Sequence, residues 1–159
     1  MKRFILIFFS IFLLSSCNTD YINNTMEQTE KNISSPEIYS MITKDLTLPN
    51  LKSLNDSELL NLYSIDPKLL LDYVSNISND NISGVEISIF RLKDAQNNTE
   101  VILGIQERIK HLENDYKLNK QNQYYLIKNP YIKIFNNYIV FVLHEDIKKV
   151  ETVLNSIFN

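Results

Sequence analysis

An apolar run of eleven residues, 4–14, sets the first limit on how this chain can fold. Lys2 and Arg3 precede the run, and Ser15, Ser16 and Cys17 follow it. A transmembrane helix needs about 20 apolar residues to cross the hydrocarbon core, so this run is too short to span a bilayer. A basic start, a short apolar core and small residues are typical of a cleaved export signal. We therefore expect the fold to form from the residues that follow residue 16.

The only cysteine, Cys17, comes directly after Leu14, Ser15 and Ser16, and these four residues resemble the bacterial lipobox. In proteins with a lipobox the thiol receives a diacylglycerol, and the signal is cleaved just before the cysteine. The resemblance predicts that residues 1–16 are a lipoprotein signal peptide. It also predicts that the lipid on Cys17 anchors the protein to the extracytoplasmic face of the cell membrane. The alternative is a chance thiol near the cleavage point of a simple secreted protein.

Charge and composition exclude several functional classes. After removal of residues 1–16 the chain has 14 basic and 19 acidic residues, and a net charge near −5 disfavours a nucleic-acid partner. Two glycines, Gly84 and Gly104, are too few for a Walker loop or a dinucleotide fingerprint. One cysteine excludes an internal disulfide and a multi-cysteine zinc site. We expect no metal and no cofactor.

The rest of the chain divides into two parts. Residues 17–35 are predicted to form the lipidated cysteine and a flexible tether, because residues 18–34 have few apolar side chains and no sustained period. Residues 36–159 are predicted to form a single α+β domain.

Apolar periodicity and capping residues predict the elements of this domain. Helices are expected near residues 36–46, 55–63, 98–116 and 146–158, and strands near residues 70–77, 85–92, 131–135 and 138–144. Strand pairs with helices between them suit an antiparallel sheet of about four strands with helices packed on one face. The expected order is α-α-β-β-α-β-β-α.

Two local features refine this expectation. Gly104 lies inside a predicted helix at a cost of about 1 kcal/mol relative to Ala, which indicates a close approach of that helix to the sheet. Asn136 and Asn137 are predicted to form a two-residue type I′ turn, because Asn tolerates a positive φ. Residues 138–143 are apolar on both faces and predict a central strand.

Several of these segments resemble a known family. The lipobox, the strand at residues 86–94, the long helix after it, the Tyr124–Tyr125 region and the hairpin closing with residues 138–141 carry the resemblance. Over residues 36–158 the chain is similar to a domain-of-unknown-function family of small lipoproteins from low-GC Gram-positive bacteria. Members of this family usually have a glycine just before the aromatic residue that opens the last strand, where this chain has Asn136 and Asn137. The resemblance implies anchoring and architecture, but no activity.

No catalytic constellation is visible in the sequence. His144, Glu145 and Asp146 cluster where a strand meets a helix, but adjacent residues of a strand point to opposite faces. Acids at a helix start are also expected from the helix dipole, so we interpret this cluster as a helix cap. The alternative is a general base or a metal ligand at His144.

One segment, residues 116–133, contains aromatic and basic side chains without a single acid. Aromatic faces beside cations dock anionic polymers, lipid headgroups or acidic patches of proteins. The alternative is that the tyrosines cover the core and the lysines keep the loop soluble. The candidate anionic-surface patch consists of Lys117, Lys120, Tyr124, Tyr125, Lys128 and Lys133.

These observations favour a lipid-anchored extracytoplasmic domain that binds or scaffolds a partner, such as a cell-envelope protein or an anionic wall polymer. A small-ligand binding lipoprotein that assists a transporter is the second hypothesis, and a deep pocket would favour it. An enzyme is the third, and a histidine within hydrogen-bond reach of a carboxylate would favour it.

Overall fold

The computed structural model describes residues 32–79, 83–119 and 121–159. The predicted signal peptide, Cys17 and Lys120 lie outside these residues. The helices are α1 (Ser35–Thr43), α2 (Asp56–Tyr63), α3 (Asn98–Asn119), α4 (Tyr124–Lys128) and α5 (Ile147–Phe158). The strands are β1 (Leu51–Ser53), β2 (Leu70–Ser78), β3 (Glu86–Leu92), β4 (Tyr131–Phe135) and β5 (Tyr138–Leu143). Within the described ranges, no helix is both long enough and apolar enough to cross a membrane.

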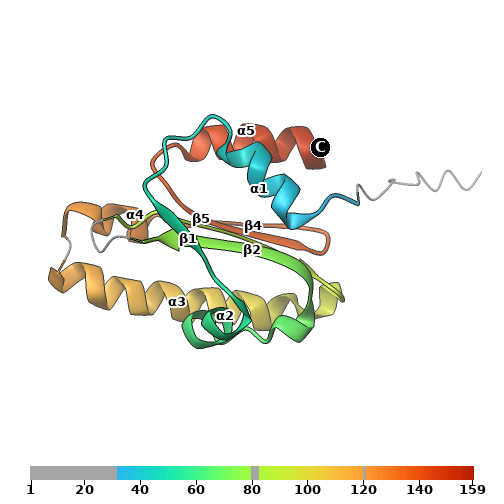
Figure 1. Ribbon diagram of the computed structural model, residues 1–159, viewed down its shortest axis with the longest axis horizontal. Coiled ribbons are helices and arrows are strands. Elements are labelled where there is room, and N and C mark those ends of the chain that lie inside the picture. Colours follow the sequence, from blue (N-terminus) through green and yellow to red (C-terminus); the bar gives the residue numbers. More distant parts are fainter. Residues whose placement is uncertain (1–31, 80–82, 120) are drawn as a thin grey trace, which may run out of the picture. The chain divides into compact units, whose positions relative to one another are not determined.

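The strands form one sheet in the order β1-β2-β3-β5-β4, and all neighbouring strands are antiparallel. After β3 the chain continues as α3, which runs below the sheet, and then returns to form the edge strand β4 (Figure 1). The hairpin that follows β4 places β5 between β3 and β4. The predicted α+β class and antiparallel sheet are confirmed. The sheet has one strand more than expected, because β1 adds a short edge to β2.

Helices cover both faces of the sheet rather than one. Figure 1 shows α1 and α5 above the sheet and α2 and α3 below it. The cause lies in β3: Ile87 and Ile89 pack in the core beneath α1 and α5, whereas Phe90 and Leu92 pack in the core against α2 and α3. A strand that is apolar on both faces must be covered on both. The expected arrangement with helices on one face is therefore corrected.

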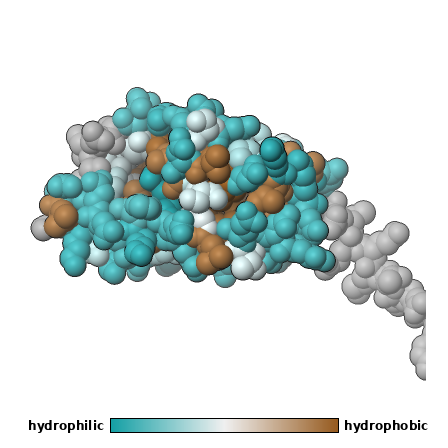
Figure 2. Space-filling view, turned by 90° about the horizontal axis from the view of Figure 1, so that it is seen from below, coloured by the Kyte–Doolittle hydropathy of each residue, from teal (hydrophilic) through white to brown (hydrophobic). Residues whose placement is uncertain are grey.

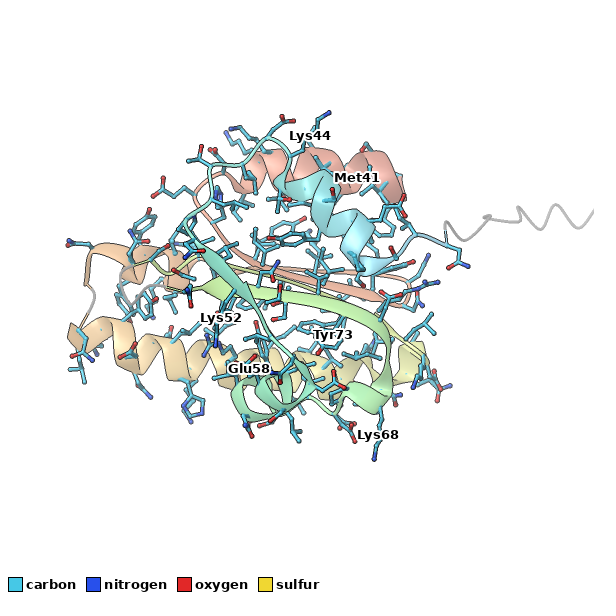
Figure 3. All side chains as sticks on the ribbon, viewed as in Figure 1. Met41, Lys44, Lys52, Glu58, Lys68 and Tyr73 are labelled. Carbon is cyan, nitrogen blue, oxygen red and sulfur yellow. The ribbon has the colours of Figure 1, made fainter. Side chains whose placement is uncertain are left out.

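The capping signals are confirmed at α2. Asn55 Oδ1 accepts from the backbone N–H of Glu58 at 3.0 Å, and Glu58 Oε2 accepts from the backbone N–H of Asn55 at 3.0 Å. Two contacts then attach this end of α2 to the sheet: Lys52 Nζ lies 2.9 Å from Glu58 Oε1, and Tyr73 Oη donates to Asp56 Oδ1 at 2.7 Å (Figure 3). The hydrogen bond from Asn55, together with Lys52, lowers the pKa of Glu58.

The last residues of the predicted tether, 32–35, contact the folded domain. Tyr138 Oη donates to the carbonyl of Ile33 at 2.6 Å, and the backbone N–H of Ser35 donates to Asp72 Oδ1 at 2.8 Å. Ile33 also packs against the core beneath α1 and α5. The structured domain therefore extends back to residue 32.

The β4–β5 turn differs from the expected type. Asn136 has a φ of 51°, as predicted, but Asn137 does not have a positive φ, and a type I′ turn requires both. Asn137 is held instead by the end of β3. Its Nδ2 donates to the carbonyl of Leu92 at 3.1 Å, and its carbonyl accepts from the Leu92 N–H at 2.8 Å. This tertiary contact, which sequence alone does not reveal, selects the turn.

Gly104 does mark a close approach, but to the end of α2 rather than to the sheet. A Cβ at Gly104 would overlap the carbonyl oxygen of Tyr63 and lie 2.7 Å from Ile65 Cγ1. Both neighbours are fully buried, and one of the two contacts is with backbone. No side chain fits at this position of α3.

We expect Gly104→Ala to lower the free energy of unfolding by about 2 kcal/mol or more, because overpacking against buried backbone is destabilising. Helix propensity alone predicts the opposite sign, a gain of about 1 kcal/mol. Chemical denaturation monitored by circular dichroism distinguishes the two. Gln106→Ala, at an exposed position of the same helix, is the control and should leave the unfolding midpoint unchanged. A stabilised Gly104→Ala protein would contradict the close approach.

Candidate functional site

The most deeply buried charges form an ion pair between the sheet and α3. Glu86 opens β3 and is 2% exposed, and Arg108 reaches it from α3. Arg108 Nη2 lies 2.8 Å from Glu86 Oε2, and Arg108 Nε lies 3.2 and 3.3 Å from the two carboxylate oxygens. Burial lowers the pKa of Arg108, but the charge and hydrogen bonds of Glu86 outweigh it and raise the pKa. The guanidinium is thereby held in its charged form.

Hydroxyl groups extend this ion pair into the sheet. Tyr63, at the end of α2, donates its hydroxyl hydrogen to Glu86 Oε1. The Tyr63 oxygen also lies 2.8 Å from Ser88 Oγ, which in turn lies 2.8 Å from Ser75 Oγ on the neighbouring strand. Burial, followed by the negative charge of Glu86, raises the pKa of Tyr63 well above its ordinary value. Within this network the carboxylate is saturated with donors, which suits a structural role.

Sequence reasoning missed Arg108, although a signal was present. Val101, Ile105 and Leu112 form the buried stripe of α3, and Arg108 falls on the same stripe. A cation at a core-facing position of a helix requires a buried acid opposite it. Glu86, on the otherwise buried β3, is that acid.

A small cavity of about 30 Å³ lies beside the ion pair, between the start of β3 and α3. Its lining includes Ser78, Gly84, Glu86, Arg108 and Tyr116. A cavity of this size holds about two water molecules. It is too small for a metabolite.

His144 is held by the backbone on both sides of its ring. Its Nδ1 accepts from the N–H of Asp146 at 2.9 Å, and its Nε2 lies 3.1 Å from the carbonyl oxygen of Thr47. Because Nδ1 is an acceptor, the ring proton resides on Nε2 and is donated to Thr47. His144 therefore supports the backbone at Asp146, the N-cap residue of α5, whereas the side chain of Asp146 makes no capping hydrogen bond, in contrast to the cap interpretation. The two partners of the ring among the described residues are both backbone groups.

A larger hollow of about 310 Å³ opens at the same end of the sheet, where β3 begins and β5 ends. Val85 and Leu126 are its apolar residues. The hollow is bounded by four segments that lie far apart in the sequence. Its polar residues are Thr47, Ser83, Gln123, His144, Glu145 and Asp146.

The described residues of the candidate anionic-surface patch have partners outside the segment. Lys128 is paired with Glu113 Oε1 at 3.2 Å and lies 5.7 Å from the centre of the Tyr124 ring. Tyr125 donates its hydroxyl hydrogen to Glu145, and this hydrogen bond raises the pKa of Tyr125 to about 12. Glu113 and Glu145, which lie outside residues 116–133, are thus the partners of Lys128 and Tyr125.

Strand alternation also separates Lys133 from Lys128. Tyr131 and Phe135 of β4 pack against the core beneath α1 and α5, so Lys133, between them, points to that same face. Lys128 contacts Glu113 of α3, which lies on the other face of the sheet. Lys117 is exposed on α3, and Lys120 lies outside the described residues.

The surface around α2 and α3 is mostly hydrophilic, with apolar groups near its middle (Figure 2). Three exposed leucines belong to these helices, Leu60 of α2 and Leu103 and Leu118 of α3. Among residues 32–79, 83–119 and 121–159, no three His, Cys, Asp or Glu side chains are grouped so as to hold a metal ion.

A five-stranded antiparallel sheet between two helical layers, with a polar hollow at one end, defines an α+β domain. The family model described as "Domain of unknown function (DUF4358)" matches residues 44–144, and the chain belongs to this family. The match covers all five strands, the buried ion pair and every residue named for the hollow except Glu145 and Asp146. No curated protein and no solved structure matches the chain.

We expect Glu86→Gln and Arg108→Met each to lower the free energy of unfolding by about 3–5 kcal/mol, because each leaves the remaining charge buried without its partner. The double variant should lose less than the sum of the two. Chemical denaturation of all four proteins gives the coupling energy. Lys128→Met, which breaks an exposed ion pair, is the control and should leave stability unchanged. Strictly additive losses would show that the pair is not coupled.

The rim of the hollow also gives a titration test. Replacement of the carboxylate in Glu145→Gln should lower the pKa of Tyr125 from about 12 toward its ordinary value of 10.0. Ultraviolet difference titration of the tyrosines measures this change, and Tyr125→Phe identifies the signal. An unchanged Tyr125 titration in Glu145→Gln would mean that the two side chains are not hydrogen-bonded.

Proposed function

We propose that this protein is a membrane-anchored extracytoplasmic lipoprotein whose folded domain binds a ligand or a partner at the cell surface. The observation that carries the proposal is the sequence Leu14-Ser15-Ser16-Cys17 directly after a basic and apolar leader. Burial of acyl chains gains about 0.8 kcal/mol per methylene, so two chains hold a protein on the membrane durably. The family resemblance to lipoproteins of low-GC Gram-positive bacteria supports the same conclusion.

The fold is compatible with such an anchor. Fourteen residues separate Cys17 from residue 32, where the described domain begins, and a flexible coil of this length spans on the order of 20 Å. The first turn of α1 lies at the right end of the sheet in Figure 1, and α4 lies at the left end. The hollow, which α4 helps to line, is therefore at the end of the domain opposite the first turn of α1.

A second candidate function is favoured by the hollow itself. Small-molecule sites have volumes of roughly 300–1,000 Å³ and combine apolar residues with a few convergent polar groups. The hollow is at the lower limit of this range and has that combination. The domain would then present a small ligand to a transporter or another envelope protein.

We expect Cys17→Ser to abolish both acylation and membrane association, because the serine hydroxyl is not the nucleophile that the lipid-transferring enzyme uses. Metabolic labelling with an alkyne-bearing fatty acid, followed by membrane fractionation, measures both in the native host. Ser16→Ala retains a small residue before the cysteine and should remain labelled. Label on the Cys17→Ser protein, or an intact leader detected by mass spectrometry, would overturn the proposal.

A further inference from the structure

The hollow at the end of the sheet contains several polar atoms that have no hydrogen-bond partner among the described residues. Glu145 uses Oε1 to accept from Tyr125, and its Oε2 is available. Gln123 uses Oε1 to accept from the N–H of Gly84 at 3.4 Å, so its NH₂ group is available as a donor. The Thr47 hydroxyl is also available, because only the Thr47 carbonyl contacts His144. A ligand in the hollow thus meets acceptors, donors and a carboxylate.

The residues that line the hollow carry more negative than positive charge. Glu145 and Asp146 contribute two carboxylates, and Asp146 is paired with Lys149 at 3.0 Å. The pairing leaves Glu145 as the carboxylate whose charge no described basic side chain offsets. The lining residues that the structure describes include no Lys and no Arg, and His144 holds its single ring proton toward Thr47. The local field therefore attracts a cation and repels an anion.

The rigid parts of the hollow also match a small ligand. His144 is 8% exposed and bonded at both ring nitrogens, Val85 belongs to the buried core, and Leu126 is 3% exposed. These residues form a preformed wall, so binding a ligand costs little ordering entropy. The polar groups at the rim then determine which ligand fits.

The geometry points to a binding site for a small hydroxylated molecule that carries an ammonium group, that is, an amino sugar. The ammonium group donates to Glu145, and the hydroxyl groups exchange hydrogen bonds with Thr47 and the amide of Gln123. This assignment deepens the proposed binding role of the domain and does not depend on the lipid anchor.

Other ligand chemistries fit less well. A free amino acid brings a carboxylate, for which the described lining offers no cationic partner. A bound metal ion needs at least three grouped ligands, and the described residues do not provide such a group. A neutral sugar retains the hydroxyl contacts but leaves Glu145 without a positive partner, so it should bind more weakly.

Isothermal titration calorimetry of the full protein, purified from its host in non-ionic detergent, tests the inference with glucosamine as the probe. Glucose is the matched ligand, because it has a hydroxyl where glucosamine has an ammonium group. We expect glucosamine to bind with at least a tenfold advantage over glucose, since a charge-assisted hydrogen bond is roughly twice as strong as a neutral one. Glu145→Gln should remove that advantage, and Thr47→Val should weaken both sugars.

Glu100→Gln is the matched control, because it makes the same change at an exposed position at the start of α3. It should leave the affinity for glucosamine unchanged. The inference is overturned if glucosamine does not bind, if glucose binds equally well, or if Glu145→Gln retains the preference for glucosamine. Fatty-acid labelling of the same protein reports the lipid anchor independently, so failure of the site and failure of the anchor are distinguishable.

Discussion

Burial of the central strands on both faces is the constraint on which the rest of this fold depends. β3 and β5 place apolar side chains alternately above and below the sheet, and neither set can remain in water. Two helical layers are therefore required, α1 with α5 on one side and α2 with α3 on the other (Figure 1). The insertion of β5 between β3 and β4 follows from the same requirement, because the most apolar strand takes an interior position.

The ion pair of Glu86 and Arg108 is the exception within this apolar interior, and it lies where the sheet ends. Glu86 accepts hydrogen bonds from both Tyr63 and Arg108, so β3, α2 and α3 are connected at one point. Such a pair contributes little net stability compared with apolar residues, but it fixes the relative position of the elements that it joins. The start of β3 is thereby fixed, and Ser83 and Val85, immediately before it, line the hollow. The buried charges thus lie beside one wall of the candidate site and position it.

Local signals in the sequence predicted most of the elements. Contacts between segments that are distant in the sequence could not be predicted in this way. Asn55 and Glu58 predicted the start of α2, and Asn136 predicted the turn of the last hairpin, because caps and turns depend on neighbouring residues. β1 was missed, since its three residues form a strand only by pairing with β2. The candidate patch stays a prediction, but its residues come from different elements: strand alternation places Lys133 on the α1 and α5 side of the sheet, whereas Lys128 of α4 contacts Glu113 of α3. The hollow was missed for a similar reason: its walls come from four separate segments.

The contacts at residues 32–35 determine which strands bear a pulling force applied to the chain ahead of residue 32. Ile33 is bonded to Tyr138 of β5, and Ser35 is bonded to Asp72 of β2. These strands flank β3, so tension applied to the chain ahead of residue 32 is distributed over the middle of the sheet rather than over an edge strand. Interior strands are hydrogen-bonded to neighbours on both sides and must break both ladders before they separate. The hollow lies at the other end of these strands, away from the point where such tension is applied.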